Sequence, residues 1–444
     1  MSRASLLLAC ILLPNFAFAQ PTIPLSTSRS SAEDAAGRST TMAAQQSPTS
    51  AAGRLITLDD AIQLALANSP SIKAARTQIQ QSQAQEITAN LRPNPVVGGD
   101  SQFIPFFNPG QFSQDVEQYD IGLGYTFERG GKRHKRLLAA RDQTAVTTSQ
   151  VTDAERTLTF NVAQQFINAL LANSNLSFAE DGLKSFQQTV DISEQRYKAG
   201  DISEGDFLKI ELQLLQFQTD VSSARVAKVQ ALGSLRQLIG YAALPRDFDV
   251  TGDLTFQPLS ASLEDLEAAA LRERPDLRAA QQGITAARSQ VALAKANGTQ
   301  DLTLTTNYSH TPGLSSLSWF LSMPLPIFDR NQGEIARTRF ALTQAELTQQ
   351  SAHDTVMTDV INAYESSITN QQVVQLYTSG YLKQAQDSRD ISAYAYKGGA
   401  ATLLDFLDAE RSYRATQLAY RQALAAYMLS LEQLRQAVGT RSLP

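Results

Sequence analysis

The chain has 444 residues, a formal net charge of −5 and a charged fraction of 18%. Such a mildly acidic chain without a basic block is a poor ligand for nucleic acid, so we expect no nucleic-acid partner. Its single cysteine is Cys10, which excludes an intramolecular disulfide and a thiolate cluster for a metal ion. After the first twenty residues, no segment approaches the roughly 18 consecutive apolar residues of a membrane-spanning helix.

Residues 1–19 are typical of a secretory signal peptide. Arg3 supplies the positive start, an apolar stretch follows, and the sequence AFA before Gln20 forms a cleavage site. A lipoprotein signal ending at Cys10 is the alternative, although it would leave a very short apolar region. Residues 20–53 are rich in Ser, Thr, Ala and Gln and have no apolar period, which indicates a disordered leader.

From residue 54 onward the chain contains two copies of one plan, about two hundred residues apart. The motifs YKAG, DFL and LRQLIG of the first copy recur in the same order as YKGG, DFL and LRQAVG. Several matched motifs in one order favour an internal duplication over chance similarity. We expect the first repeat at residues 54–240, a linker at 241–258 and the second repeat at 259–440.

Each repeat is expected to open with two helices. In the first repeat Thr57 is the expected N-cap, because two aspartates follow it and suit the positive end of a helix dipole. A second helix is expected from Pro70 to about Arg92, where prolines at 93 and 95 prevent its continuation.

Two strands are expected next in each repeat, since large apolar residues alternate there with small or polar ones. The expected strands are residues 95–103, 118–127, 301–309 and 317–325, with hairpin loops at 104–118 and 310–316. Runs of nine or ten such residues have the length of a tilted membrane-spanning strand. Two hairpins of a soluble sheet are the alternative interpretation.

Each repeat is expected to end in a hairpin of two very long helices. A helix from Lys132 to about Lys198 would contain no proline and would extend roughly 100 Å. Helices of this length usually pack as coiled coils. Gly200 and Gly399 are the expected turns of the two hairpins, and Ser203 and Thr402 are expected to cap the return helices.

Four strands cannot close a barrel, and an open sheet edge is not tolerated in lipid. The strands therefore predict an oligomer, and three copies would supply about twelve strands around a lumen. The expected fold is mainly α with a membrane β-barrel portion. Duplicated long helical hairpins would form an α-helical barrel, and the four strands per chain would be completed to a twelve-stranded barrel in a homotrimer.

This plan resembles the TolC-like outer-membrane factor family over nearly all of the chain after the leader. The segments FERGGKR at 127–133 and PLPIFDRNQG at 324–333 resemble the cobalt–zinc–cadmium resistance branch of that family. The resemblance implies a passive exit duct in the outer membrane of a Gram-negative bacterium, with long helices in the periplasm. It also implies a periplasmic membrane-fusion adaptor, an inner-membrane pump of the resistance-nodulation-division type, and divalent metal cations as cargo.

The resemblance also implies a pore gate at the tip of the helices. The candidate gate residues are Asp405 and Asp408, three residues apart, with Asp206 as the match of Asp405 in the first repeat. The alternative is that these aspartates are ordinary solvated residues of a helix surface. Seven residues are candidates for adaptor contacts, although turn geometry alone would also explain them: Tyr197, Gly200, Asp201, Ser203, Tyr396, Gly399 and Thr402.

Other functions receive less support from the sequence. Only three histidines occur, widely separated, and no phosphate loop or nucleophile elbow is present. We therefore expect no enzymatic activity, no cofactor and no metal site. A multidrug or type I secretion duct, or a soluble periplasmic coiled-coil protein, is the alternative function.

Overall fold

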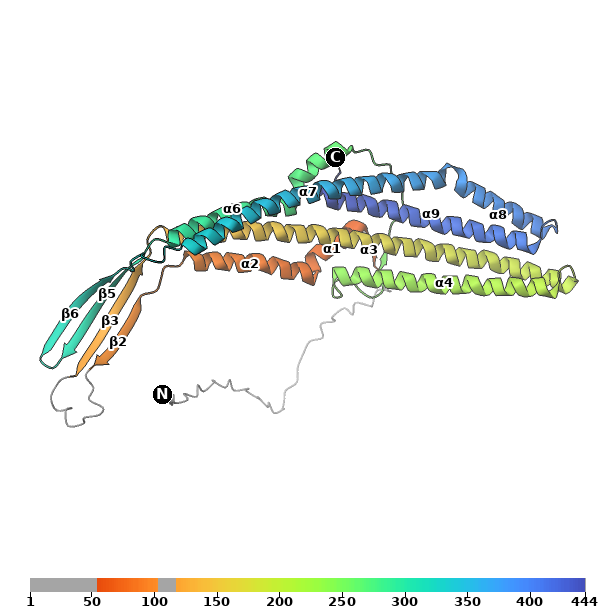
Figure 1. Ribbon diagram of the computed structural model, residues 1–444. Helices are drawn as coiled ribbons and strands as arrows, with labels where there is room; N and C mark the ends of the chain where they lie inside the picture. Colours follow the sequence, from red (N-terminus) through yellow and green to blue (C-terminus); the bar gives the residue numbers. More distant parts are fainter. Residues whose placement is uncertain (1–53, 103–116, 444) are drawn as a thin grey trace, which may run out of the picture. The chain divides into compact units, whose positions relative to one another are not determined.

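The computed structural model describes residues 54–102 and 117–443, and most of these residues are helical (Figure 1). The expected signal peptide, the leader, Cys10 and most of the first hairpin loop lie outside the described residues. In the described ranges, no helix combines the length and the apolar character needed to cross a membrane.

The two repeats have the same order of elements. The first contains α1 (Leu58–Asn68), α2 (Pro70–Asn90), β2 (Val96–Gln102), β3 (Gln118–Phe127), α3 (Lys132–Ala199) and α4 (Glu204–Ile239). The second contains α5 (Leu263–Glu273), α6 (Pro275–Asn297), β5 (Leu302–Thr311), β6 (Leu314–Ser322), α7 (Gln332–Leu376), α8 (Leu382–Lys397) and α9 (Leu403–Val438). Two short strands, β1 (Leu55–Ile56) and β4 (Asp249–Val250), pair in parallel. The segment expected as a linker thus holds a strand that returns to the start of the first repeat.

Local capping chemistry sets where the helices begin. Thr57 caps α1 in a capping box with Asp60, which confirms the expected N-cap. The long helices α3 and α7 begin after Gly131 (φ 68°) and Asn331 (φ 63°), both in the left-handed region. The two repeats therefore enter their long helices through the same backbone turn, with glycine in one copy and asparagine in the other.

The four longer strands form one antiparallel sheet in the order β2-β3-β5-β6. One face carries apolar side chains, among them Ile121 of β3 and Leu317 of β6, both more than half exposed. The other face carries mainly small and polar side chains, among them the paired neighbours Asn307 of β5 and Ser318 of β6, together with the larger apolar residues Val96 and Phe320. Edge strands β2 and β6 have no partner on their outer sides among the described residues.

The expected position of the last strand was wrong by three residues. The sequence alternation suggested 317–325, but β6 spans Leu314–Ser322. Strands β5 and β6 are joined by a tight turn that contains Gly313 (φ 86°) in place of the longer loop expected at 310–316. Pro324 has no backbone N–H for a ladder, which is consistent with the strand ending before it.

Helix α3 connects the parts of the fold. It packs against α2 and α6 near the sheet and against α4 and α9 further along its length, while α7 lies beside α6 and α8 lies beside α9 (Figure 1). The helices therefore lie in a row of four, α2-α3-α6-α7 near the sheet and α4-α3-α9-α8 towards the hairpin turns. A row of this kind leaves its two outer helices without a partner on one side.

The long helix expected in the second repeat is interrupted, whereas α3 is continuous over 68 residues. After α7, residues Tyr377–Tyr381 form a π-helical turn in which Gly380 has φ 147°, and α8 then continues. The kink coincides with the first glycine after Gly333. Glycine can adopt this backbone conformation at little cost, so the kink has an identifiable local cause.

Candidate functional site

Both hairpins turn where the sequence predicted. Gly200 has φ 83° and ends α3, and Ser203 caps α4 by accepting a hydrogen bond from the backbone of Asp206. In the second hairpin Gly399 has φ 74°, and Thr402 caps α9 in a capping box with Asp405. The predicted turns and caps are thereby confirmed.

The repeated tip motifs form the same aromatic pair in both hairpins. Tyr197 stacks on Phe207 with ring centroids 5.3 Å apart, and Tyr396 stacks on Phe406 at the same distance. Each pair joins the residue before the turn to the residue after it. The two phenylalanines were not among the candidate site residues, although their place in the repeated DFL motif could have identified them.

The two tips also pack against each other. Arg196 of the first hairpin donates a hydrogen bond to the backbone oxygen of Tyr396 at 3.1 Å, and its guanidinium lies 5.4 Å from the centre of that ring. Tyr396 is 7% exposed, whereas Tyr197 is 38% exposed. Of the seven candidate adaptor contacts, Tyr396 is therefore the one whose side chain is buried inside the chain.

The three candidate gate aspartates have different surroundings. Asp405 accepts hydrogen bonds from the hydroxyl and the backbone N–H of Thr402, at 2.6 and 3.2 Å, and these bonds lower the pKa of its carboxyl. The pKa of Asp206 is lowered by a hydrogen bond from Lys209 at 3.0 Å and by one from Ser203. Asp408 is exposed, and its carboxylate has no hydrogen bond or ion pair within the described residues. Asp405 thus has a structural task that Asp408 lacks.

A second cluster of charges joins the hairpins along α4 and α9. Arg414 of α9 forms an ion pair with Asp220 of α4 and lies 4.0 Å from the centre of the Phe217 ring. Burial raises the pKa of Glu410, against the opposing effect of Arg389 and Arg414. Residues of α4 and α9 line a groove of about 660 Å³ beside this cluster. These long-range contacts were not predicted.

A family model described as "Outer membrane efflux protein" matches residues 61–241 and 266–440. The chain belongs to this family. The two matched segments contain both helical hairpins and all four longer strands. The family consists of efflux proteins of the outer membrane, and the chain is accordingly an outer-membrane component of an efflux system.

The relatives of this efflux protein include a cation-efflux protein and a cobalt–zinc–cadmium resistance protein. It is 25% identical over 370 residues to the "Cation efflux system protein CusC" of Escherichia coli K12, covering 80% of each chain. It is 23% identical to the "Cobalt-zinc-cadmium resistance protein CzcC" of Cupriavidus metallidurans, covering 84% of this chain and 87% of the relative. A solved structure of CusC has the same fold, with a TM-score of 0.72, 20% identity, and coverage of 89% of this chain and 96% of that one.

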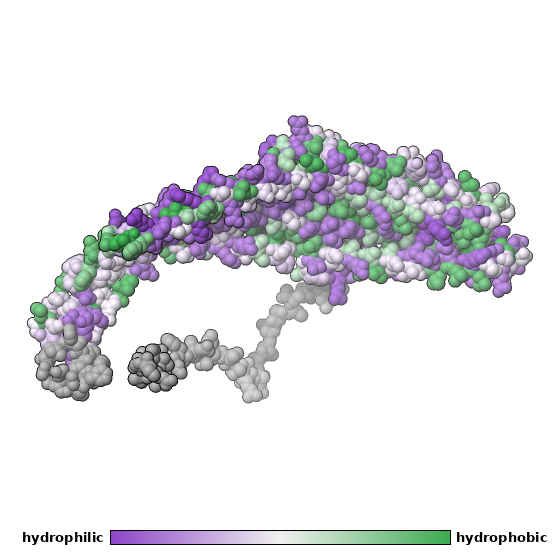
Figure 2. Space-filling view, viewed as in Figure 1, coloured by the Kyte–Doolittle hydropathy of each residue, from purple (hydrophilic) through white to green (hydrophobic). Residues whose placement is uncertain are grey.

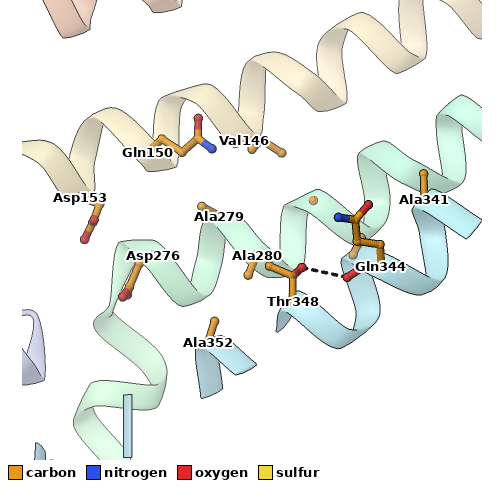
Figure 3. Close-up of a pocket in the computed structure, with 12 residues that line it drawn as sticks. Val146, Gln150, Asp153, Asp276, Ala279, Ala280, Ala341, Gln344, Thr348 and Ala352 are labelled. Carbon is orange, nitrogen blue, oxygen red and sulfur yellow. Dashed lines mark hydrogen bonds between the residues drawn. The ribbon is translucent and has the colours of Figure 1, made fainter. Parts of the chain in front are cut away.

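A hollow of about 510 Å³ lies between α3, α6 and α7 of the efflux protein (Figure 3). Small side chains such as Ala279 and Ala341 leave the space, and Gln344 and Thr348 of α7 project beside it (Figure 3). Its two carboxylates, Asp153 and Asp276, form ion pairs with Arg156 and Arg274. The remaining walls of the hollow are apolar or neutral polar.

No group of three or more His, Cys, Asp or Glu side chains in residues 54–102 and 117–443 is arranged to hold a metal ion. If metal cations are the cargo, they would encounter separate carboxylates rather than a coordination cage.

Proposed function

We propose that three copies of this chain form a passive exit duct across the outer membrane. The observation that carries the proposal is the four-stranded sheet, which has two open edges among the described residues and one apolar exposed face. Leu123, Trp319 and Leu321 on that face are 53%, 65% and 67% exposed. Joining β6 of one copy to β2 of the next would satisfy both edges and direct the apolar face to lipid, as closure in a bilayer demands.

The outer helices of the row support the same assembly. On α4 the exposed residues Leu208, Leu212, Leu215, Val226 and Val229 occupy positions of the alternating three- and four-residue spacing of a coiled-coil seam, whose two intervening positions are Thr219 and Ser222. On the opposite side of the row, α8 exposes Ile391 by 68% and Tyr394 by 82%. An α4–α8 contact between neighbouring copies would bury both sets.

The assembly can be tested with the α4 stripe. Replacing Leu212 and Leu215 by lysine should weaken the trimer, because charged residues would enter a helix seam. Gln218→Lys is the control, because Gln218 lies on the same helix about 90° around its axis from the middle of the stripe. Light scattering of detergent-extracted outer-membrane protein should give a trimer for the wild type and the control, and smaller species for the double variant. Recovery of the wild type as a soluble monomer would refute the duct.

The proposed cargo is divalent metal cations, handed over by a periplasmic adaptor and an inner-membrane pump of the resistance-nodulation-division type. The names of the relatives CusC and CzcC support this cargo. Exposed carboxylates at the tips also support it: a threefold axis would bring three copies of Asp405 and Asp408 around one pore, favouring cations. Deleting the gene should sensitise cells to metal salts. If the deletion sensitises cells to drugs and not to metal salts, the proposal of a metal cargo is wrong and the duct exports drugs.

The exposed tip residues are the proposed contacts with the adaptor. They are Tyr197, Gly200, Asp201, Ser203, Gly399 and Thr402, since Tyr396 is buried. A photo-crosslinking residue at Asp201 should capture the adaptor in cells, and one at the exposed Arg225, far along α4, should not. Equal capture at both positions would count against contact through the tips.

A further inference from the structure

Positive charge is concentrated in the segments where the strands meet the helices. We define the collar as residues 91–93, 127–136 and 323–339 together with Asp301. Its cations are Arg92, Arg129, Lys132, Arg133, Lys135, Arg136, Arg330, Arg337 and Arg339, and its carboxylates are Glu128, Asp301, Asp329 and Glu334. Nine cations against four carboxylates stand out in a chain whose net charge is −5.

Three of the collar carboxylates are already neutralised by ion pairs. These pairs join Lys132 to Asp301 at 2.7 Å, Arg136 to Glu128 at 2.6 Å and Arg337 to Glu334 at 2.6 Å. Within the described residues, Arg92, Arg129, Arg133, Lys135 and Arg330 form no ion pair with a carboxylate. Their charge is available to an external anion.

The collar also exposes large apolar side chains beside these cations. Leu325, Ile327 and Phe328 are 70%, 63% and 89% exposed. Hydrogen bonds from Arg330 to the oxygen of Pro326 and from Gln332 to the oxygen of Phe328, both at 3.0 Å, fix this loop. Hydrophobic and hydrophilic surface accordingly meet at the strand–helix junction (Figure 2). An apolar protrusion next to cations is typical of a membrane interface.

One collar pocket combines both kinds of surface. It encloses about 310 Å³ and is lined by Arg92, Pro93, Tyr125, Phe127, Glu128 and Arg133. The Tyr125 and Phe127 rings form an apolar wall, with centroids 4.8 Å apart. Arg133 is held in place by hydrogen bonds to the side-chain and backbone oxygens of Asn90, and Arg136 neutralises Glu128. The pocket therefore has an aromatic wall and a net positive rim.

We propose that this pocket binds the headgroup phosphate of an anionic phospholipid, with the acyl chains along the apolar face of β3. The inference rests on the proposed function only in that the strands cross the outer membrane and the helices lie in the periplasm. That orientation places the collar at the periplasmic leaflet, which contains phospholipids. A phosphate with attached chains matches a site that is cationic at the rim and aromatic beneath it.

The test is native mass spectrometry of the detergent-purified full chain with phosphatidylglycerol, phosphatidylcholine, lipid A or inorganic phosphate. Phosphatidylglycerol should bind more tightly than phosphatidylcholine. Arg92→Gln should weaken it about fivefold, and adding Arg133→Gln should weaken it by a similar factor again. Arg133 also holds Asn90 in place, so the double variant changes local structure as well as charge. The side chain of Arg92 makes no hydrogen bond within the described residues, so the single Arg92→Gln variant tests the lipid contact alone.

The charge-matched control removes two arginines outside the collar, Arg141→Gln with Arg225→Gln, whose side chains are 64% and 66% exposed. This control should retain phosphatidylglycerol. The proposal is overturned if the control loses lipid equally, if phosphatidylcholine binds as well, or if lipid A or inorganic phosphate is the ligand that depends on Arg92. Lipid binding is measured without a conductance assay. A chain that does not conduct can still bind phosphatidylglycerol, so failure of the proposed duct is distinguishable from failure of the lipid site.

Discussion

Arg274 is the residue whose removal should most disturb the seam where α6 meets α7 and α9 within the second repeat. It lies between α5 and α6, its side chain is 3% exposed, and it forms a bidentate bond with Asp276 at 2.5 and 3.0 Å. It also binds Asp359 of α7 at 2.9 Å and the backbone oxygen of Ala437 at 3.2 Å, at the end of α9. One guanidinium thus joins three helices of the second repeat.

The expected cost of Arg274→Met follows from these contacts. Removing one partner of a buried ion pair costs about 3–5 kcal/mol. Asp276 and Asp359 remain 30% and 46% exposed and can regain water, so we expect the lower end, about 3 kcal/mol. Local opening should then be about a hundredfold more frequent.

Hydrogen exchange measures this opening directly. Amides near residues 275–279 and 435–439 should exchange about a hundredfold faster in Arg274→Met when reclosing is fast. Arg278→Met, one turn later on α6 and exposed, is the control and should leave exchange unchanged. Equal effects of the two variants, or none from Arg274→Met, would refute this account of the seam.

Acidification should have a related effect in the wild type. Burial alone would raise the pKa of Asp276, but the hydrogen bonds and charge of Arg274, with Arg156 nearby, hold it below the ordinary value. A carboxyl with a lowered folded-state pKa stabilises the fold above its unfolded-state pKa and loses that contribution as pH falls through the folded value. The protection of the seam amides, measured relative to their slower intrinsic exchange in acid, should therefore fall below about pH 4, and fall less in Arg274→Met.

Three further predictions concern the tips and the kink. Asp408→Asn should lower cation selectivity in single-channel recordings and leave hydrogen exchange at the tips unchanged. Asp405→Ala should lower the selectivity and also speed that exchange, because it breaks the capping box with Thr402. If the two variants behave identically, Asp405 has no structural role beyond the one it shares with Asp408. Arg414→Gln should speed exchange at the tips about tenfold relative to Arg411→Gln, since Arg414 pairs with Asp220 of the first hairpin and Arg411 forms no ion pair within the described residues. Gly380→Ala should destabilise the α7–α8 junction by about 1–3 kcal/mol, visible as faster local exchange, because φ 147° is strained for any residue with a Cβ.

Local features of the fold were accessible from the sequence because their causes lie within a few residues. The cap at Thr402 depends on a hydroxyl and a carboxylate three positions apart, and the turn at Gly200 depends on one glycine. The continuous α3 follows from a long segment without proline. The position of β6 was less accessible, since a period of two continues past the true end of a strand and does not define its boundary.

The contacts between the hairpins could not be predicted, because they join residues about two hundred positions apart. Tyr197 and Tyr396 occupy the same place in the repeated motif, yet one is exposed and the other is covered by Arg196 of the first hairpin. Duplication gives each hairpin the same stacked tyrosine–phenylalanine pair. Packing of one hairpin on the other then makes the two tyrosines differ in exposure. The exposed tip residues of the first hairpin are therefore the better candidates for recognising a partner, while Tyr396 helps to keep the two hairpins together.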